Sequence, residues 1–327
     1  MKNRRIVSGM RPTGKLHLGH YHGVLANWKE LQEEYECFFF AADWHSLTTE
    51  YDNTGSIRES IGDMVLDWLA FGINPEKCVV FQQSHVPQHA ELNLILGMIT
   101  PVSWLERNPT YKEMQENLSS KDLSTFGFLG YPVLMASDII VYKATRVPVG
   151  HDQLPHLEIT REIARRFNYL YREVFPEPAA LLTETPKVLG LDGRKMSKSY
   201  GNAIFLSESA DETRKKIMSM VTDVQRPRRT DPGEPDRCVA FTLHRLYVPD
   251  AKRGEIVEAC RGAQIGCVDC KKILAECVVE NLAPFRSRRT ELVDQPGLVA
   301  DVLAEGSRKA SLEAQKTLAE VRDAIRI

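Results

Sequence analysis

Residues 5–28, RIVSGMRPTGKLHLGHYHGVLANW, contain the change of pattern that predicts the fold. Positions 5–9 are rich in residues that favour a β-strand, and positions 11–14 combine Arg, Pro, Thr and Gly, a composition typical of a turn. From position 18 to position 28, apolar residues recur every three or four positions, which predicts a helix. A strand that passes through a short turn into a helix is typical of a parallel α/β sheet.

The same alternation continues along the first half of the chain. Residues 37–42 form a continuous apolar run rich in Phe, as expected for a strand buried on both faces. A helical pattern over 61–71 ends at Gly72, and 79–81 is a third strand candidate. Residues 90–142 have a mostly helical pattern interrupted by prolines, which predicts a helical insertion between two halves of the sheet.

The C-terminal part differs in pattern. From about residue 208 onward strand signals disappear, and helical segments separated by Pro or Gly continue to the end. A length of 327 residues also favours two domains at about 150 residues per domain. We therefore predict an α/β domain with a parallel sheet, followed by an all-helical domain that begins at 200–210.

Composition narrows the class of protein. Apolar residues make up 43% and charged residues 26%, values typical of soluble globular proteins. The balance of 42 Lys and Arg against 44 Asp and Glu excludes a basic coat over the whole surface. The longest apolar run, 37–42, is too short to cross a membrane, and the N-terminal apolar residues are too few for a signal peptide. We expect a cytoplasmic protein without a membrane span, whose seven cysteines are thiols or metal ligands.

Two distant segments carry side chains suited to phosphates. Residues 12–20, PTGKLHLGH, lie at the expected strand-to-helix junction, and residues 193–199, GRKMSKS, form a lysine-rich loop. The pair His17 and His20 lacks nearby partners for a zinc site, and a lysine-rich loop alone is usually a solvated surface. In an α/β sheet, however, phosphates bind where helix N-termini meet the carboxyl ends of strands. Together the segments predict a nucleoside triphosphate site, and no P-loop pattern occurs in the chain.

The same two segments carry a family resemblance. HLGH at 17–20 and KMSKS at 195–199 resemble the two signatures of class I aminoacyl-tRNA synthetases. The chain is similar to the tryptophanyl-tRNA synthetase family over its whole length, most clearly at 8–14 (SGMRPTG), 42–45 (ADWH), 131–138 (YPVLMASD) and 147–153 (VPVGHDQ). The resemblance implies activation of L-tryptophan by ATP to tryptophanyl-adenylate, followed by transfer to tRNA(Trp), with release of pyrophosphate and AMP.

The resemblance also implies an organisation and partners. Residues 1–202 are expected to form a Rossmann-like catalytic domain whose helical insertion joins two subunits into a homodimer. Residues 203–327 are expected to form a helical domain that binds the tRNA anticodon region. Mg²⁺ is expected to bind to the ATP phosphates, since no carboxylate cage is visible.

Site residues follow from the same resemblance. The ATP site is expected to include Arg11, Pro12, Thr13, Gly19, His20, Gly150, His151, Asp152, Val188, Lys195, Met196, Ser197, Lys198 and Ser199. Charge stabilisation during the reaction is assigned to His17, His20, Lys112, Lys195 and Lys198. The tryptophan site is expected to include Val7, His45, Tyr131, Met135, Asp138 and Gln153. Because an indole N–H can only donate, the site needs an acceptor, and the resemblance assigns this role to Asp138.

Four cysteines in the C-terminal part have the spacing C-x21-C-x6-C-x2-C: Cys238, Cys260, Cys267 and Cys270. Such thiolates suit zinc or an iron–sulfur cluster, and buried free thiols are the alternative. The run 265–272 resembles a subgroup of bacterial tryptophanyl enzymes with a [4Fe–4S] cluster, although the first gap is one residue shorter here. We expect a cluster, with Zn²⁺ as the alternative metal and Cys277 as the alternative to Cys238.

Three other functions remain open. A tyrosyl-tRNA synthetase shares this scaffold, a catalytically silent relative keeps the fold, and an unrelated α/β nucleotidylyltransferase shares the histidine motif. Met135, where tyrosyl enzymes typically have Gln, favours tryptophan, and the intact KMSKS motif favours an active enzyme. The chain departs from many family members at His20, at His151 and at Arg11, which adds a positive charge to the nucleotide turn.

Overall fold

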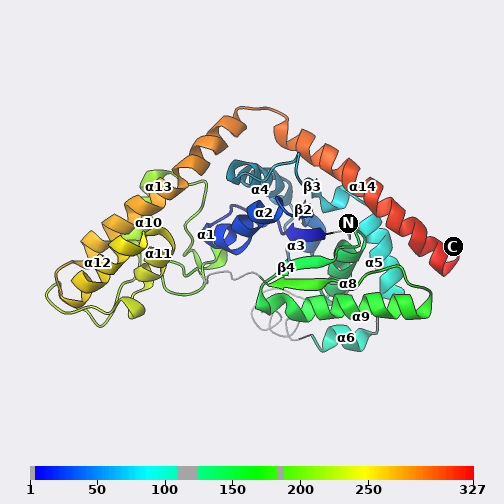
Figure 1. Ribbon diagram of the computed structural model, residues 1–327, viewed down its shortest axis with the longest axis horizontal. Coiled ribbons are helices and arrows are strands. Elements are labelled where there is room, and N and C mark those ends of the chain that lie inside the picture. The colour runs from blue at the N-terminus through cyan, green and yellow to red at the C-terminus, as the bar shows by residue number, and fades with distance from the viewer. Residues whose placement is uncertain (1–3, 109–123, 183–187) are drawn as a thin grey trace.

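The computed structural model describes residues 4–108, 124–182 and 188–327 (Figure 1). In these residues a five-stranded parallel sheet has the order β3-β2-β1-β4-β5. Its strands are β1 (Arg5–Met10), β2 (Glu36–Ala41), β3 (Val79–Gln82), β4 (Arg146–Val149) and β5 (Ala179–Leu182). The strand order reverses beside β1, and ligands of α/β proteins bind at the carboxyl ends of strands next to such a point. The predicted α/β class is confirmed.

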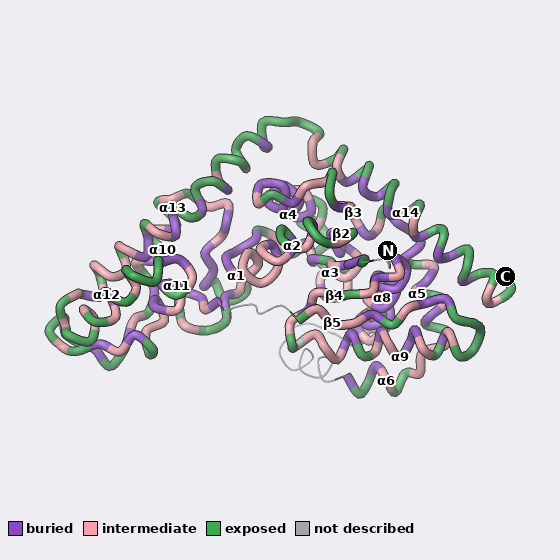
Figure 2. The backbone as a smooth tube through the Cα atoms, viewed as in Figure 1, coloured by how far each residue is buried: buried purple, intermediate pink, exposed green. Residues whose placement is uncertain are grey.

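The two faces of the sheet are covered by different helices. On β2, Phe39 packs into one core with Trp28 and Trp68, while Phe38 and Phe40 pack into the other. This alternation follows from the two-residue period of a strand. The first core also contains α1 (Leu18–His20), α2 (Ala26–Leu31) and α4 (Ile57–Phe71), and the second contains α5 (Gln88–Ile99), α8 (Phe126–Ile140) and α9 (Leu154–Leu170). Figure 2 shows burial concentrated on the inner faces of the helices, whereas β5 is only partly buried.

Two local details differ from the sequence prediction. The helix expected over 18–28 is interrupted by a π-helical turn, Tyr21–Leu25, directly after the histidine motif. Such turns are rare and often lie at functional sites. The strands β4 and β5 were missed, because β4 contains Pro148 and β5, with the sequence AALL, has no β-branched or aromatic residue.

The C-terminal part is helical. Its helices are α10 (Ala210–Ser219), α11 (Val239–Tyr247), α12 (Asp250–Arg261), α13 (Cys267–Val293) and α14 (Leu298–Ile325). Figure 1 shows α13 running from the α10–α12 helices back toward α4, and α14 continuing from there along the sheet. A Cβ atom on Gly306 of α14 would lie 1.7 Å from the carbonyl oxygen of Val80, so α14 packs directly on β3. The domain boundary at 202/203 stays a prediction. No helix in the described ranges is long and apolar enough to span a membrane.

Candidate active site

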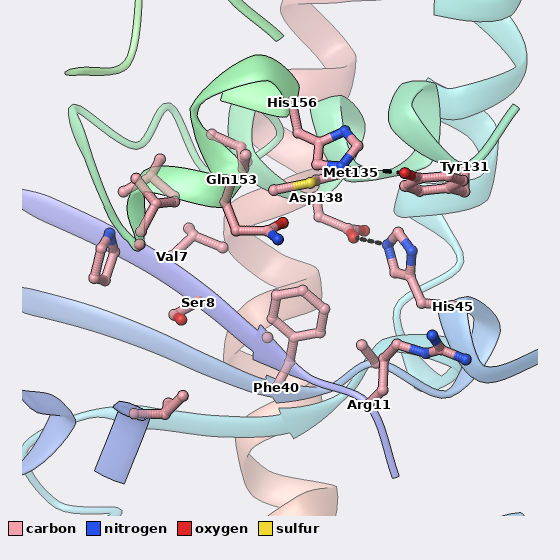
Figure 3. A pocket seen from close by; sticks show the side chains of 18 of the residues that line it. Val7, Ser8, Arg11, Phe40, His45, Tyr131, Met135, Asp138, Gln153 and His156 are labelled. Atoms are coloured by element: carbon pink, nitrogen blue, oxygen red, sulfur yellow. Dashed lines mark hydrogen bonds and ion pairs between the residues drawn. The ribbon is translucent and has the colours of Figure 1, made fainter. Parts of the chain in front are cut away.

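A cavity of about 430 Å³ opens at the carboxyl ends of β1, β2 and β4 (Figure 3). Its size lies within the range of about 300–1,000 Å³ that is usual for small-molecule sites. Figure 3 shows Asp138 and Met135 on one side of the cavity and Phe40 opposite them. All the residues expected to bind tryptophan line it: Val7, His45, Tyr131, Met135, Asp138 and Gln153.

Asp138 is the buried charge in the wall of this cavity, with a side chain that is 3% exposed. Its Oδ2 atom lies 2.7 Å from Nε2 of His45, which belongs to α3 (Asp43–Glu50). Its Oδ1 atom accepts from Gln83 Nε2 at 2.8 Å and lies 2.6 Å from His89 Nδ1. Burial alone would raise the pKa of Asp138, but the charges and hydrogen bonds of His45 and His89 outweigh burial and lower it. The carboxylate therefore remains ionised and can only accept hydrogen bonds.

Gln83 and His89 were not among the residues expected from the sequence. Both follow the carboxyl end of β3, in a 3₁₀ turn (Gln83–His85) and in α5. The rule that polar residues at adjacent strand ends converge could have identified them as candidates.

Apolar side chains form part of the cavity wall. Phe40, Met135, Val147 and Val149 line it. The ring of Phe40 crosses over Gly9 so closely that a Cβ atom there would lie 2.4 Å from it. Position 9 of β1 therefore requires glycine.

A second group of polar residues supports the other side of the cavity. Tyr131 Oη lies 3.1 Å from His156 Nε2, and His156 Nδ1 lies 2.9 Å from Asn108 Nδ2. Tyr131 and His156 both line the cavity, and His156 was not among the expected site residues. His156 comes from α9 and Tyr131 from α8, two helices that pack on each other, so only the tertiary structure shows this contact.

The two motif histidines cap the start of α1. His17 Nδ1 accepts from the backbone N–H of Gly19 at 3.1 Å, and His20 Nδ1 accepts from the backbone N–H of His17 at 3.1 Å. A Cβ atom on Gly19 would lie 2.9 Å from the His17 ring, so glycine is needed for this arrangement. Because each Nδ1 accepts, each neutral ring carries its proton on Nε2 and can donate it to a phosphate oxygen.

The lysine loop meets the histidine motif, although about 180 residues separate them in the chain. Lys198 Nζ donates to Thr13 O at 2.6 Å and to Thr13 Oγ1 at 3.2 Å. Burial, followed by the charges of Lys198 and Lys195, lowers the pKa of His17 to about 4. Burial and the Arg11 charge lower the pKa of Lys198 to about 8. Near pH 7 the histidines are therefore neutral donors, and Lys198 carries most of its charge.

Arg11 lines the cavity and lies in the turn that leads to the histidine motif. Its Nη2 donates to Thr49 Oγ1, and its Nε is buried without an acceptor in the described part of the chain. A buried guanidinium nitrogen without a partner favours an anionic ligand at this point.

Asn202 holds the lysine loop in shape. Its Oδ1 accepts from the backbone N–H of Ser197 at 2.8 Å, and its Nδ2 donates to Asp192 Oδ1 at 2.7 Å. The hydrogen bond from Asn202, followed by those from Arg194, lowers the pKa of Asp192 to about 2. A Cβ atom on Gly190 would overlap the Asn202 side chain, at 2.3 Å. Asn202 and Asp192 were not identified from the sequence, since their role depends on the loop conformation.

The remaining expected residues are distributed around these elements. Gly150 lines the cavity, and His151 is exposed. Val188 and Met196 are buried, and the Met196 N–H donates to the Val188 carbonyl at 3.1 Å. Lys112 and the side chain of Asp152 lie outside the described residues.

The four cysteines of the C-terminal part line one small cavity together: Cys238, Cys260, Cys267 and Cys270. Arg226 is buried beside them, with Nη1 at 3.7 Å from Cys260 Sγ and 4.0 Å from Cys267 Sγ. Its Nε is buried without a partner in the described residues. Burial, followed by the other three cysteines, raises the pKa of Cys270 to about 12. No three His, Cys, Asp or Glu side chains in the described ranges are placed to hold a single metal ion.

Comparison with known proteins gives a consistent result. The family model described as "tRNA synthetases class I (W and Y)" matches residues 1–283. The tryptophan–tRNA ligase of Thermotoga maritima is 54% identical over 99% of this chain and 99% of its own length. That of Aquifex aeolicus is 48% identical over 99% of this chain and 100% of its own length. The structure of tryptophanyl-tRNA synthetase from Campylobacter jejuni, complexed with ADP and tryptophan, matches with a TM-score of 0.88. It is 33% identical over 99% of this chain and 100% of that chain.

Proposed function

Since the chain belongs to the class I tRNA synthetases for tryptophan and tyrosine, we propose that it activates L-tryptophan with ATP and transfers it to tRNA(Trp). The observation that carries this proposal is the ionised Asp138 in the wall of an apolar cavity, beside the lysine loop and the histidine motif. An ionised carboxylate is the acceptor that an indole N–H needs.

The proposed reaction joins two substrates that are already ionised. The tryptophan carboxylate attacks the α-phosphorus of ATP, an acyl-phosphate bond forms, and the bond to pyrophosphate breaks. Positioning and charge stabilisation therefore supply most of the catalysis. We assign the leaving pyrophosphate to Lys195 and Lys198, and phosphate oxygens to Nε2 of His17 and His20. Mg²⁺ enters on the ATP phosphates. Lys112 remains a proposed further contact.

The remaining ATP and tryptophan contacts are proposals on the same basis. Gln153 lines the cavity and is assigned to the tryptophan ammonium group. We assign nucleotide binding to residues of the turn after β1, the histidine motif, the segment after β4 and the lysine loop with its flank: Arg11, Pro12, Thr13, Gly19, Gly150, His151, Asp152, Val188, Met196, Ser197 and Ser199.

Amino-acid-dependent exchange of pyrophosphate into ATP tests this function. We expect exchange with L-tryptophan and little with L-tyrosine. Exchange that depends on tyrosine would establish the tyrosyl alternative, and no exchange with either would favour a silent relative. Charging of tRNA(Trp) transcript then tests the second step and distinguishes the enzyme from a nucleotidylyltransferase without a tRNA substrate.

We also propose a homodimer, formed through α5, α6 (Val102–Glu106) and the start of α8. These helices expose Leu94, Met98, Val102 and Phe126 by 55–88%, and a second copy of the chain would cover them. Leu96, on the same helix as Leu94, is not available for this contact, because it is fully buried in its own subunit. The molar masses of Met98→Glu and of the unaltered chain, measured by light scattering, test this interface. We expect a dimer for the unaltered chain and a monomer for Met98→Glu, and a dimer in both would refute this interface.

The helical domain, predicted as 203–327, is proposed to bind the anticodon region of tRNA(Trp). The enzyme acts in translation, and we therefore place it in the cytoplasm. A variant that loses tRNA charging while keeping pyrophosphate exchange, with substitutions confined to the α10–α13 segment, would support this division of roles.

For the four cysteines we propose a [4Fe–4S] cluster. They share one cavity, and Arg226 with its unpartnered Nε supplies positive charge beside the sulfur atoms. When bound, the cluster would tie α11, α12 and α13 together, and it takes no part in the activation step.

Metal analysis of anaerobically purified protein tests the cluster. We expect about four irons per chain and brown colour. Cys267→Ser should lose the iron, and the matched variant Cys277→Ser should retain it. One zinc per chain in a colourless protein would establish the alternative metal, and neither metal would leave four free thiols.

A further inference from the structure

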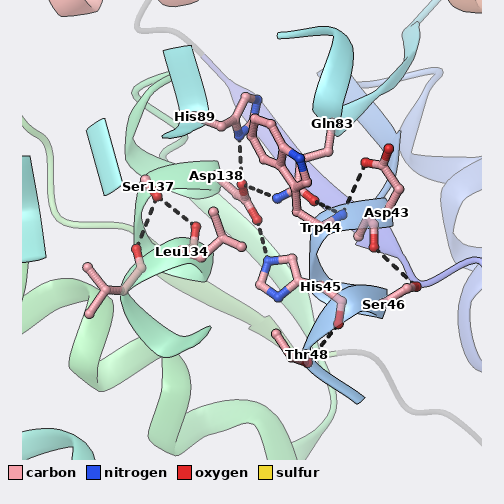
Figure 4. Close-up of polar contacts among 12 residues, drawn as sticks. Asp43, Trp44, His45, Ser46, Thr48, Gln83, His89, Leu134, Ser137 and Asp138 are labelled. Atoms are coloured by element: carbon pink, nitrogen blue, oxygen red, sulfur yellow. Dashed lines mark hydrogen bonds and ion pairs between the residues drawn. The ribbon is translucent and has the colours of Figure 1, made fainter. Parts of the chain in front are cut away.

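The carboxylate of Asp138 is held by two residues that do not line the cavity, Gln83 and His89. Figure 4 shows them pointing at Asp138 from the segment after β3, while His45 reaches it from α3. Gln83 also accepts from the backbone N–H of Trp44 at 3.2 Å, so its amide is fixed at both ends.

These contacts leave one acceptor position open. A carboxylate offers about two lone pairs on each oxygen. Gln83 and His89 occupy both positions on Oδ1, and His45 occupies one on Oδ2. In the described part of the chain the only open position is therefore on Oδ2. Because Asp138 and His45 both line the cavity, this oxygen lies at its wall.

His89 is itself fixed by a further residue. Its Nδ1 must donate to the ionised carboxylate, and its Nε2 lies within hydrogen-bond distance of Tyr142 Oη, at 2.7 Å. His89 and Tyr142 are both fully buried, so water does not replace either hydrogen bond. Burial, with the nearby Asp138 charge, raises the pKa of Tyr142 well above its usual value, so the hydroxyl keeps its proton.

We propose that His89 is a positioning residue that makes the cavity select a ring with an N–H group. With Tyr142, it keeps Asp138 ionised and occupies Oδ1, so the carboxylate meets a ligand only as an acceptor at Oδ2. Without the His89 donor, Asp138 takes up a proton more readily, and a protonated carboxyl group can donate to rings that lack an N–H. The inference rests on the proposed function and extends it to a residue outside the cavity.

The test compares two substrates of nearly the same shape in pyrophosphate exchange. L-Tryptophan has the N–H group, and β-(3-benzothienyl)-L-alanine has sulfur in its place. We expect His89→Leu to lower the ratio of kcat/KM values, tryptophan over analogue, by about 10-fold or more, mainly through the KM for tryptophan. His89→Asn, whose amide can donate from the Nδ1 position, should restore most of the ratio. His85→Leu, an exposed residue of the same segment, should leave it unchanged.

Each result bears on the inference. If His89→Leu slows both substrates equally, or leaves the ratio unchanged, His89 has only a structural role and the proposal is wrong. If His89→Leu does not fold, Tyr142→Phe replaces it, because that variant keeps the ring volume and should lower the ratio by about 2- to 10-fold; an unchanged ratio there also overturns the proposal. An unaltered enzyme without tryptophan-dependent exchange would refute the proposed function instead.

Discussion

Replacing Asp138 by asparagine tests the assigned acceptor directly. The carboxylate receives hydrogen bonds from Gln83, His89 and His45, and we assign a fourth from the indole N–H. Asparagine has nearly the same size but only one oxygen, with two lone pairs, and it adds two N–H donors of its own. Four donors then compete for two lone pairs, so at least two of them lose a partner.

The expected magnitude follows from the charge of the lost acceptor. A hydrogen bond to a charged group contributes about 1.5–3 kcal/mol, which corresponds to a fall in tryptophan affinity of about 10- to 150-fold. An unsatisfied buried donor costs a further ~1–3 kcal/mol of folding free energy, so we also expect a lower melting temperature for Asp138→Asn.

Pyrophosphate exchange gives the KM for tryptophan, and calorimetric titration gives the tryptophan affinity independently. Asp67→Asn is the matched control, because Asp67 is a buried carboxylate on α4 that binds Arg289 and lies outside the cavity. It should lose stability without a change in this KM. A folded Asp138→Asn enzyme whose KM stays within about twofold of the unaltered value would refute the role of Asp138.

Three further predictions concern other parts of the molecule. We expect Lys195→Ala to slow adenylate formation in single turnovers far more than it weakens ATP binding; equal effects would contradict its assignment to the leaving group. Because burial and the Arg11 charge lower the pKa of Lys198 to about 8, its ammonium is lost as pH rises through 8. The kcat/KM for ATP should therefore fall above that pH, and Lys198→Arg should remove the decline. Gly306→Ala would place a Cβ atom 1.7 Å from a β3 carbonyl and should cost at least about 1–3 kcal/mol of folding free energy, measured by urea unfolding. Gly254→Ala at an exposed position of α12, where no atom lies within 4 Å, should show no such loss.

Local patterns were enough to predict part of the fold. The strand at 5–9 and the helical pattern after it depend on residues close in the chain, and β1, α1 and α2 confirm them. The strands at 37–42 and 79–81 were also confirmed to within a residue or two. The π-helical turn was not predictable in this way, because its apolar spacing over 21–25 resembles that of an α-helix.

The return of α14 to the sheet was not predictable either. Its amphipathic pattern identifies a helix but does not identify the surface that the helix covers. From the sequence, Gly306 is only an unfavourable residue within a helix. The structure gives the reason for it, because the carbonyl of Val80 leaves no room for a Cβ atom there.

For the site, the chain order of residues established the kinds of group available: imidazoles that can donate to phosphates, lysine charges and one carboxylate among apolar neighbours. Only the tertiary structure decided which lone pair of Asp138 is open, because Gln83 and His89 reach it from the segment after β3 and His45 from α3. Hydrogen-bond capacity belongs to each residue type and can be read from the sequence, whereas its occupation depends on which strand ends meet in space.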